Sequence, residues 1–140
     1  MPDRAFIDTN ILVYAIETVG ADADKPAVAR SLLDELEACL STQVLGEFYS
    51  ATTNRKRESP LTHEEASAWI QLWKRFEVQS VTSSHVDLAL EIAGIQHVNY
   101  YDALILATAR LAGCKIVYSE DLNPDQDYGG VRVQNPFVRE

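Results

Sequence analysis

Short apolar runs alternate along this chain with longer stretches whose apolar residues recur every three or four positions. The short runs have the length of buried strands and lie at 5–8, 38–40, 78–81, 116–118 and 131–133. The longer stretches have helical periodicity and lie at 10–16, 27–37, 42–55, 62–76, 83–93 and 101–112. Strands that alternate with helices predict a parallel sheet whose connections are right-handed helical crossovers.

Several helix ends are marked by residues that favour such ends. Thr62 and Glu65 form the pattern of a capping box at the start of one helix. We expect Thr9 or Asn10 to cap the first helix, and Gly94 to end the helix that begins near residue 83. The stretch 101–112 is apolar on nearly all sides, so we expect this helix in the centre of the fold.

The composition is that of an ordinary globular protein, with 46% apolar and 24% charged residues in 140. This length suits a single domain with one core. No apolar run reaches the roughly 18 residues that span a bilayer, and the first residues do not resemble a signal peptide, so we expect a cytoplasmic protein. Cys39 and Cys114 lie far apart in apolar surroundings, and we expect two reduced, buried thiols.

The net charge of −9 argues against indiscriminate binding to nucleic acids, which requires a basic surface. Two bound divalent cations would add four positive charges and still leave −5. Any contact with a polyanion therefore needs a local basic patch. The run Asn54–Arg57 is the dense basic segment, and it suits either an RNA-binding role or a solvated helix end.

Four acidic residues stand beside the predicted elements. Asp8 ends the first strand, and Asp121 closely follows the strand 116–118. Asp102 lies in the first turn of its helix, and Glu47 lies one turn further into its own. The carboxyl ends of parallel strands and the N-termini of the returning helices share one edge of the sheet, so the topology directs all four acids to that edge.

Taken singly, each acid has a structural explanation as a helix cap, a surface residue, a partner of a helix dipole or a loop residue. Together they are harder to explain, because two carboxylates ~4 Å apart repel by about 4 kcal/mol at an effective dielectric of about 20. No basic residue adjoins any of the four in the sequence. They must spread apart, take up protons or hold a hard cation such as Mg²⁺ or Mn²⁺. The last arrangement suits an enzyme that acts on phosphodiesters.

The segments that contain these acids resemble a known family. Phe6–Asn10, the helical Glu47, Tyr101–Ala109 and Ser119–Asp121 are similar, in order and spacing, to PIN-domain ribonucleases. Within that family the chain resembles the VapC-type toxins of bacterial toxin–antitoxin pairs. The resemblance covers essentially the whole chain, and it implies one three-layer α/β/α domain over 1–140 with a central parallel sheet.

The resemblance also implies an activity, which is a Mg²⁺- or Mn²⁺-dependent endoribonuclease that hydrolyses RNA with a metal-activated water. By this similarity Asp8, Glu47, Asp102 and Asp121 form the catalytic metal site, with Asp8 and Asp102 expected as direct ligands. Glu47 and Asp121 are expected to act through water, and Ser119 to hold the Asp121 loop through its hydroxyl. The implied partners are an RNA substrate, a small antitoxin protein and a second copy of the chain, with no membrane.

Other functions stay open at this stage. A non-catalytic PIN-like or other α/β module would use the acidic edge to bind a basic protein partner. A Mg²⁺-dependent phosphatase or phosphoacceptor domain would use Asp8 as nucleophile, with Lys115 near the phosphate. Leu122 follows Asp121 where some family members have a further residue of the site, so the contribution of Asp125 is also open.

Two groups of ring-bearing residues have structural and functional interpretations. Trp69, Trp73 and Phe76 recur at helical spacing, and we expect them in the core rather than stacked on bases or on an antitoxin helix. The histidines share no spacing, so we expect surface or helix-end positions for His63, His85 and His97.

Overall fold

A computed structural model describes residues 4–18, 24–124 and 126–138. The strands in this part of the chain are β1 (Arg4–Ile7), β2 (Glu37–Ser41), β3 (Glu77–Gln79), β4 (Ile116–Tyr118) and β5 (Arg132–Gln134). They form one sheet in the order β3-β2-β1-β4-β5, and every neighbouring pair is parallel. The first strand of the chain therefore lies in the middle of the sheet, with strands added on both sides.

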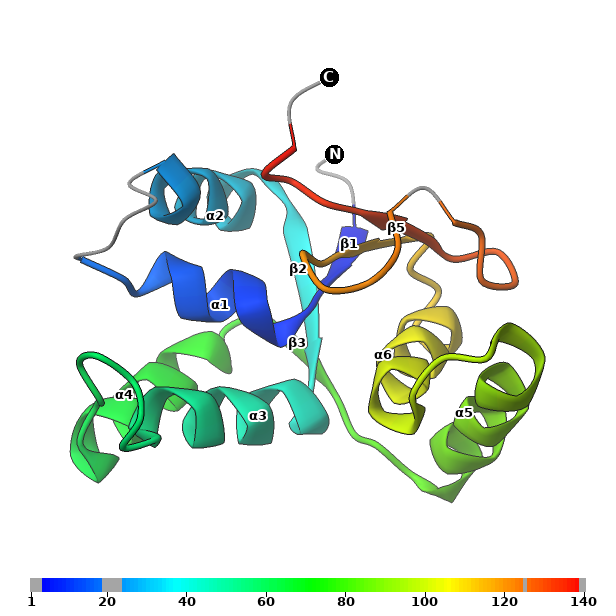
Figure 1. Ribbon diagram of the computed structural model, residues 1–140, viewed down its shortest axis with the longest axis horizontal. Coiled ribbons are helices and arrows are strands. Elements are labelled where there is room, and N and C mark those ends of the chain that lie inside the picture. The colour runs from blue at the N-terminus through cyan, green and yellow to red at the C-terminus, as the bar shows by residue number, and fades with distance from the viewer. Residues whose placement is uncertain (1–3, 19–23, 125, 139–140) are drawn as a thin grey trace.

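Six helices connect the described strands. They are α1 (Thr9–Ala15), α2 (Asp24–Glu35), α3 (Thr42–Thr53), α4 (His63–Trp73), α5 (Ser83–Gln96) and α6 (Tyr100–Leu111). In Figure 1, α1 to α4 lie on one side of the strands, and α5 and α6 pack against each other on the opposite side. The predicted three-layer α/β/α arrangement with a central parallel sheet is confirmed.

The centre of the molecule is the most apolar helix, α6. Every residue from Ala103 to Ala109 is buried, as the sequence predicts. On the other side, Ile11 and Leu12 of α1 and Phe48 of α3 are fully buried in the same core. These two buried faces fix how the N-termini of α1, α3 and α6 meet the edge of the sheet.

Some element ends differ from the sequence-based prediction. Asp8, rather than Thr9 or Asn10, caps α1. Helix α5 passes through Gly94 and ends at His97, which adopts the left-handed conformation with φ of 56°. Gly94 meets no neighbouring atom and its conformation is helical, so nothing at that position stops the helix. The capping box of Thr62 and Glu65 is present as predicted.

The ring-bearing residues and the cysteines lie where the sequence places them. Trp73 is buried and stacks with Trp69 at 5.4 Å between ring centroids, and Phe76 packs beyond it. Cys39 and Cys114 are buried and free. None of the described helices is long and apolar enough to cross a membrane. The histidines lie at a helix start, a capping position and a helix end: His63, His85 and His97.

Candidate active site

Asp8 occupies the junction between β1 and α1. Its backbone N–H donates to the Tyr118 carbonyl of β4 at 3.0 Å, which continues the pairing of β1 with β4. Its Oδ1 accepts the backbone N–H of Thr9 at 2.8 Å, and its Oδ2 accepts the Ser119 hydroxyl at 2.7 Å. The same carboxylate therefore caps α1 and faces the edge of the sheet.

Burial raises the pKa of Asp8 from its ordinary value of 3.8 to about 6. The hydrogen bonds from Ser119 and from the backbone of Thr9 oppose this rise, because they stabilise the anion. The negative charges of Glu47 and Asp121 add to it. The carboxylate is thus an anion that the surroundings only partly compensate.

Asn10 and Ser119 connect Asp8 to Asp121. The Asn10 amide Nδ2 lies 3.4 Å from Asp8 Oδ2 and 3.1 Å from Asp121 Oδ2. Its Oδ1 accepts the backbone N–H of Glu120 at 3.2 Å. The Ser119 hydroxyl oxygen accepts the backbone N–H of Asp121 at 3.1 Å, the contact expected from the sequence. These bonds fix the loop that follows β4 against the start of α1.

Glu47 reaches the same edge from α3. Its Oε1 accepts the hydroxyl of Thr9 at 2.7 Å, and its Oε2 accepts the amide of Gln43 at 3.3 Å. Gln43 lies one turn before Glu47 on α3 and also donates to the Tyr101 carbonyl of α6 at 3.1 Å. Both oxygens of Glu47 are therefore held by neutral donors, and no cation neutralises the carboxylate among the described residues.

Asp102 lies in the first turn of α6, on the opposite side of the edge. Asn99 caps this helix and accepts the backbone N–H of Asp102 at 3.3 Å. The carboxylate itself accepts no hydrogen bond from a described residue. Its pKa is raised, first by burial and then by the charges of Asp121 and Glu47. Asp102 is thus half-buried, close to other anions and free to turn.

All four predicted acids line one pocket, which we call the acidic pocket. Its volume is about 660 Å³, which lies in the range of small-molecule sites. The other lining residues come mainly from α1 and α3; they are Thr9, Asn10, Val13, Tyr14, Glu17, Ser50, Ala51, Asn54, Ile105 and Glu120. Asp125 lies outside the described residues, and Lys115 stands at the opposite end of β4, away from the pocket.

The acids of the pocket are spread rather than clustered. No three His, Cys, Asp or Glu side chains in the described part of the chain form a group that holds a metal ion as they lie. The pocket nevertheless offers only oxygen donors of the hard type that Mg²⁺ and Mn²⁺ prefer. Two of its carboxylates, Asp8 and Asp102, have pKa values raised by burial and by neighbouring negative charge. The donor set fits a hard divalent cation.

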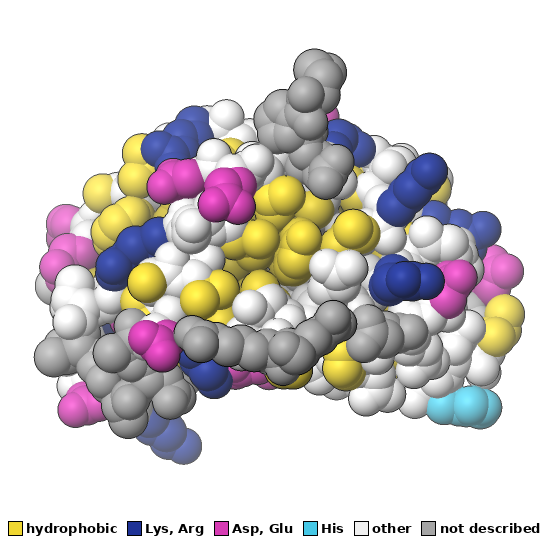
Figure 2. Space-filling view, turned by 90° about the horizontal axis from the view of Figure 1, so that it is seen from above, with side chains coloured by type: hydrophobic (Ala, Val, Ile, Leu, Met, Phe, Trp, Pro, Cys, Tyr) yellow, Lys and Arg dark blue, Asp and Glu magenta, His cyan; other side chains and the backbone are white. Residues whose placement is uncertain are grey.

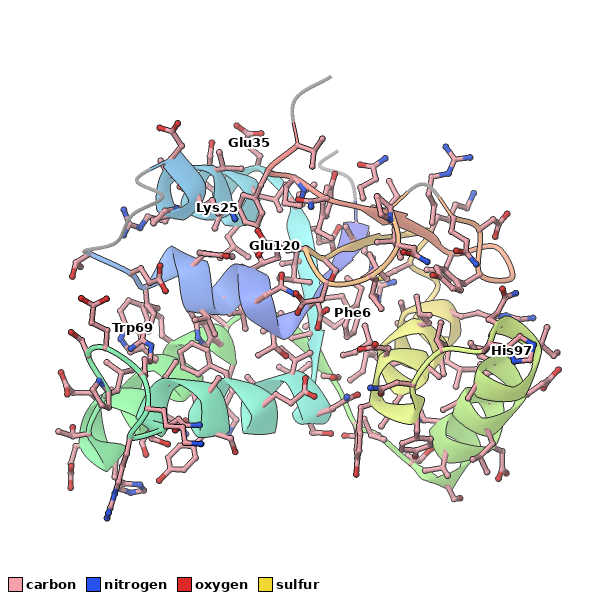
Figure 3. All side chains as sticks on the ribbon, in the orientation of Figure 1. Phe6, Lys25, Glu35, Trp69, His97 and Glu120 are labelled. Carbon is pink, nitrogen blue, oxygen red and sulfur yellow. The ribbon has the colours of Figure 1, made fainter. Side chains whose placement is uncertain are left out.

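A second polar cluster at the pocket wall has no counterpart in the sequence-based prediction. Glu120 accepts the Tyr14 hydroxyl at 2.7 Å and the Lys25 ammonium at 2.6 Å, and Lys25 and Glu120 face each other between α1 and α2 in Figure 3. Burial alone would raise the pKa of Glu120, but these two hydrogen bonds outweigh it and lower the pKa. Glu120 is therefore a neutralised carboxylate, unlike its neighbour Asp121.

The chain matches the family model described as PIN domain over residues 5–126, and it belongs to that family. The match includes β1, all six helices and β4, so it covers every element that contributes to the acidic pocket. A comparison with functionally curated proteins gives no match.

Solved structures with this fold include several proteins of toxin–antitoxin systems. A toxin–antitoxin complex from Klebsiella pneumoniae has a TM-score of 0.67 and 18% identity, over 95% of this chain and 98% of the other. The sarcin–ricin loop cleaving toxin VapC20 of Mycobacterium tuberculosis has a TM-score of 0.66 and 19% identity, over 84% and 89%. DNA-bound VapBC from Salmonella typhimurium has a TM-score of 0.65 and 21% identity, over 96% and 98%. At these identities the likeness concerns the fold.

Proposed function

We propose that this protein is a divalent-metal-dependent endoribonuclease and the toxin of a toxin–antitoxin pair. One observation supports the proposal above all: four carboxylates from three separate helices or their caps and one loop line a single pocket of a PIN-family fold. The proposed catalytic and metal-binding residues are Asp8, Glu47, Asp102 and Asp121. The proposed domain spans the whole chain.

The chain's own groups determine what the pocket contributes to catalysis. Asp8 is fixed by two hydrogen bonds and is the best oriented of the acids, so it serves as a rigid ligand. Asp102 accepts no hydrogen bond, so its carboxylate is free to turn toward a cation. A bound Mg²⁺ or Mn²⁺ supplies an activated water and stabilises charge at the phosphorus and the leaving oxygen. No Ser, Cys or His nucleophile is required.

The proposed substrate and partners follow from the structural relatives. VapC20 is a toxin that cleaves the sarcin–ricin loop, an RNA, and other structures with this fold are complexes of toxins with antitoxins. We infer an RNA substrate, a small cognate antitoxin, a homodimer and a cytoplasmic location for this chain. The antitoxin would be expected to present basic groups, because the pocket is acidic.

The deciding experiment is cleavage of single-stranded RNA in Mn²⁺ by the wild type and by the variants Asp8→Asn and Asp102→Asn. Each variant removes one anionic ligand and is expected to lower the cleavage rate at least about a hundredfold. Asp87→Asn is the matched control, because Asp87 is exposed on α5 and far from the pocket. Undiminished, metal-dependent cleavage by both pocket variants would exclude the proposed site.

A non-catalytic module that binds a basic protein is the second candidate. The spread arrangement of the carboxylates favours it, since no three of them hold a metal ion as they lie. Calorimetric titration with Mn²⁺ separates the two functions. The nuclease requires binding that is lost in Asp8→Asn, whereas the module predicts no metal binding at millimolar concentrations and an intact interaction with a basic peptide.

A further inference from the structure

The acidic pocket continues beyond the four acids as a groove between α1 and α3. On α3 the lining residues Glu47, Ser50 and Asn54 recur every three or four positions, so they share one face of the helix. On α1 the residues Val13 and Glu17 line the facing wall with the same spacing. From Glu47 to Asn54 the groove extends about 10 Å at a rise of ~1.5 Å per residue. That length corresponds to about three nucleotides at a spacing of roughly 3.4 Å.

A turn of cationic residues closes the far end of this groove. Helix α3 ends at Thr53, and Asn54 then accepts the backbone N–H of Lys56 on its side chain at 2.9 Å and that of Arg57 on its carbonyl at 3.0 Å. These two bonds bend the chain so that Asn54–Arg57, which we call the basic turn, follows directly on the groove. The run that the sequence leaves as either an RNA contact or a helix end thus lies next to the pocket.

Two cations of the basic turn are available for a ligand. Arg57 is occupied, because it lies 3.9 Å from Glu17 and donates to the Ser59 carbonyl at 2.7 Å. Arg55 and Lys56 are exposed, and neither forms an ion pair with a residue that the structure describes. Lys25, the cation nearest the other wall, is paired with Glu120. The cations at the far end of the groove are therefore the ones with unsatisfied charge.

The position of these cations matters because the rest of the molecule is acidic. The net charge is −9, so a polyanion needs a local attraction. On the face shown in Figure 2, cationic and anionic side chains are interspersed and form no continuous basic patch. A groove with carboxylates at one end and two unpaired cations at the other has a defined direction: the cations hold phosphates and the carboxylates require a metal ion.

We propose that single-stranded RNA lies along the groove between α1 and α3, with its reacting phosphate at the four acids and later phosphates on Arg55 and Lys56. The inference rests on the proposed function for its reacting end. A pocket of about 660 Å³ accepts a few nucleotides of single strand rather than a duplex. The contacts with Arg55 and Lys56 are made to phosphates, so they position the strand without reading its sequence.

Binding of a fluorescently labelled ten-nucleotide RNA, measured by anisotropy in EDTA, tests the basic turn without any cleavage. The double variant R55Q/K56Q is expected to bind about tenfold more weakly. Its dependence of log K on log salt should flatten by about 1.4, because each lost phosphate contact on a single strand removes about 0.7. The control K74Q/K115Q removes the same charge from two exposed lysines outside the groove and should bind as the wild type does.

Site-directed cross-linking tests the path itself. Ala51 lines the groove and is exposed, so a photo-reactive maleimide on A51C should cross-link the RNA in Mg²⁺. The same label on Q71C, at an exposed position of α4, should not. The native Cys39 and Cys114 are buried, so the label reacts with the introduced thiol.

Each outcome bears on one proposal. Equal binding by the wild type and R55Q/K56Q, or equal loss in both double variants, overturns the inference, as does cross-linking from Q71C but not A51C. If R55Q/K56Q instead loses binding to an acidic peptide and keeps RNA, the turn binds a protein and the inference is wrong. If the turn binds RNA as expected but the wild type fails to cleave it in Mn²⁺, the proposed nuclease fails while the groove stands.

Discussion

At the scale of single residues, Asp8 shows how the pocket differs from the rest of the fold. It is one of the few buried polar residues, and its charge is stabilised by hydrogen bonds rather than by a cation. Burial outweighs those bonds, since the pKa rises to about 6. An ionised Asp8 therefore destabilises the metal-free protein, and replacing it should relieve that cost.

Asp8→Asn is expected to raise the free energy of unfolding of the metal-free protein by about 1–3 kcal/mol near neutral pH. The native state holds the proton more tightly than the unfolded chain, so stability falls as the pH rises from about 4 to about 6. A shift of about two units corresponds to about 3 kcal/mol. Urea unfolding in EDTA at about pH 5 and about pH 7.5 measures the effect, and the difference between the two pH values should shrink in the variant.

The control for this effect is Asp87→Asn, an exposed change of the same chemistry on α5. It should leave the unfolding free energy within about 0.5 kcal/mol of the wild type. A pocket variant that is less stable than the wild type in EDTA near neutral pH would show that the hydrogen bonds, and not the burial, dominate the energetics of Asp8.

The sequence predicts the four acids but not the side chains that hold them. Asp8 and Asp121 are recognisable because the ends of parallel strands must share an edge. The contacts of Glu120 with Tyr14 and Lys25 join residues 106 and 95 positions apart, and they depend on how α1 and α2 pack rather than on any local pattern. The role of Asn10 as a bridge between two acids is hidden in the same way, since its sequence position suggests only a helix start.

At the scale of the elements, the loop after β4 is the part of the site that most needs support. Ser119 is fully buried, donates to Asp8 and accepts the backbone N–H groups of Asp121 and Leu122. A single hydroxyl thus sets both the orientation of one acid and the backbone of the loop that carries another. Its removal would leave two buried N–H groups without this acceptor.

Ser119→Ala is expected to lower metal-dependent RNA cleavage about ten- to hundredfold, the usual effect of removing a group that orients a metal ligand. Initial rates at several Mn²⁺ concentrations should show that most of the loss is in metal affinity. Ser50→Ala is the control, because Ser50 lines the same pocket but is exposed on α3 and bonds to none of the acids. Equal rates for Ser119→Ala and the wild type would contradict the positioning role.

Element types follow from local patterns more reliably than element ends do. The central position of α6 follows from its apolar residues on all sides, and the structure buries seven consecutive positions of it. The end of α5 does not follow from Gly94, because a glycine ends a helix only where the backbone turns left-handed. The chain makes that turn three residues later, at His97. Packing against α6, which no local signal reports, determines where α5 stops.

At the scale of the whole molecule, an acidic protein with an acidic pocket should gain stability from a divalent cation. A cation that binds only the native state raises the unfolding free energy by RT ln(1 + [M]/Kd), about 2.7 kcal/mol at one hundred times Kd. We expect Mn²⁺ to raise the midpoint of thermal unfolding of the wild type, and chelation to reverse the rise.

The gain should be specific to the pocket. NaCl at matched ionic strength screens the net charge of −9 without occupying the pocket, so it should reproduce little of the effect. Asp8→Asn should lose most of the response to Mn²⁺ although it is the more stable protein in EDTA. An equal response in the variant would place the bound cation elsewhere on the acidic surface.

The central place of β1 in the sheet has a consequence for synthesis on the ribosome. Asp8 is made at the start of the chain, yet Ser119, which orients it, follows 111 residues later. The early part of the chain must therefore fold while one flank of β1 has no partner strand, and contacts between such distant residues form slowly. The four acids come together only after residue 121 has been translated and β4 has docked. A ribosome that makes this protein has nearly finished its work before the nascent chain contains a complete acidic pocket.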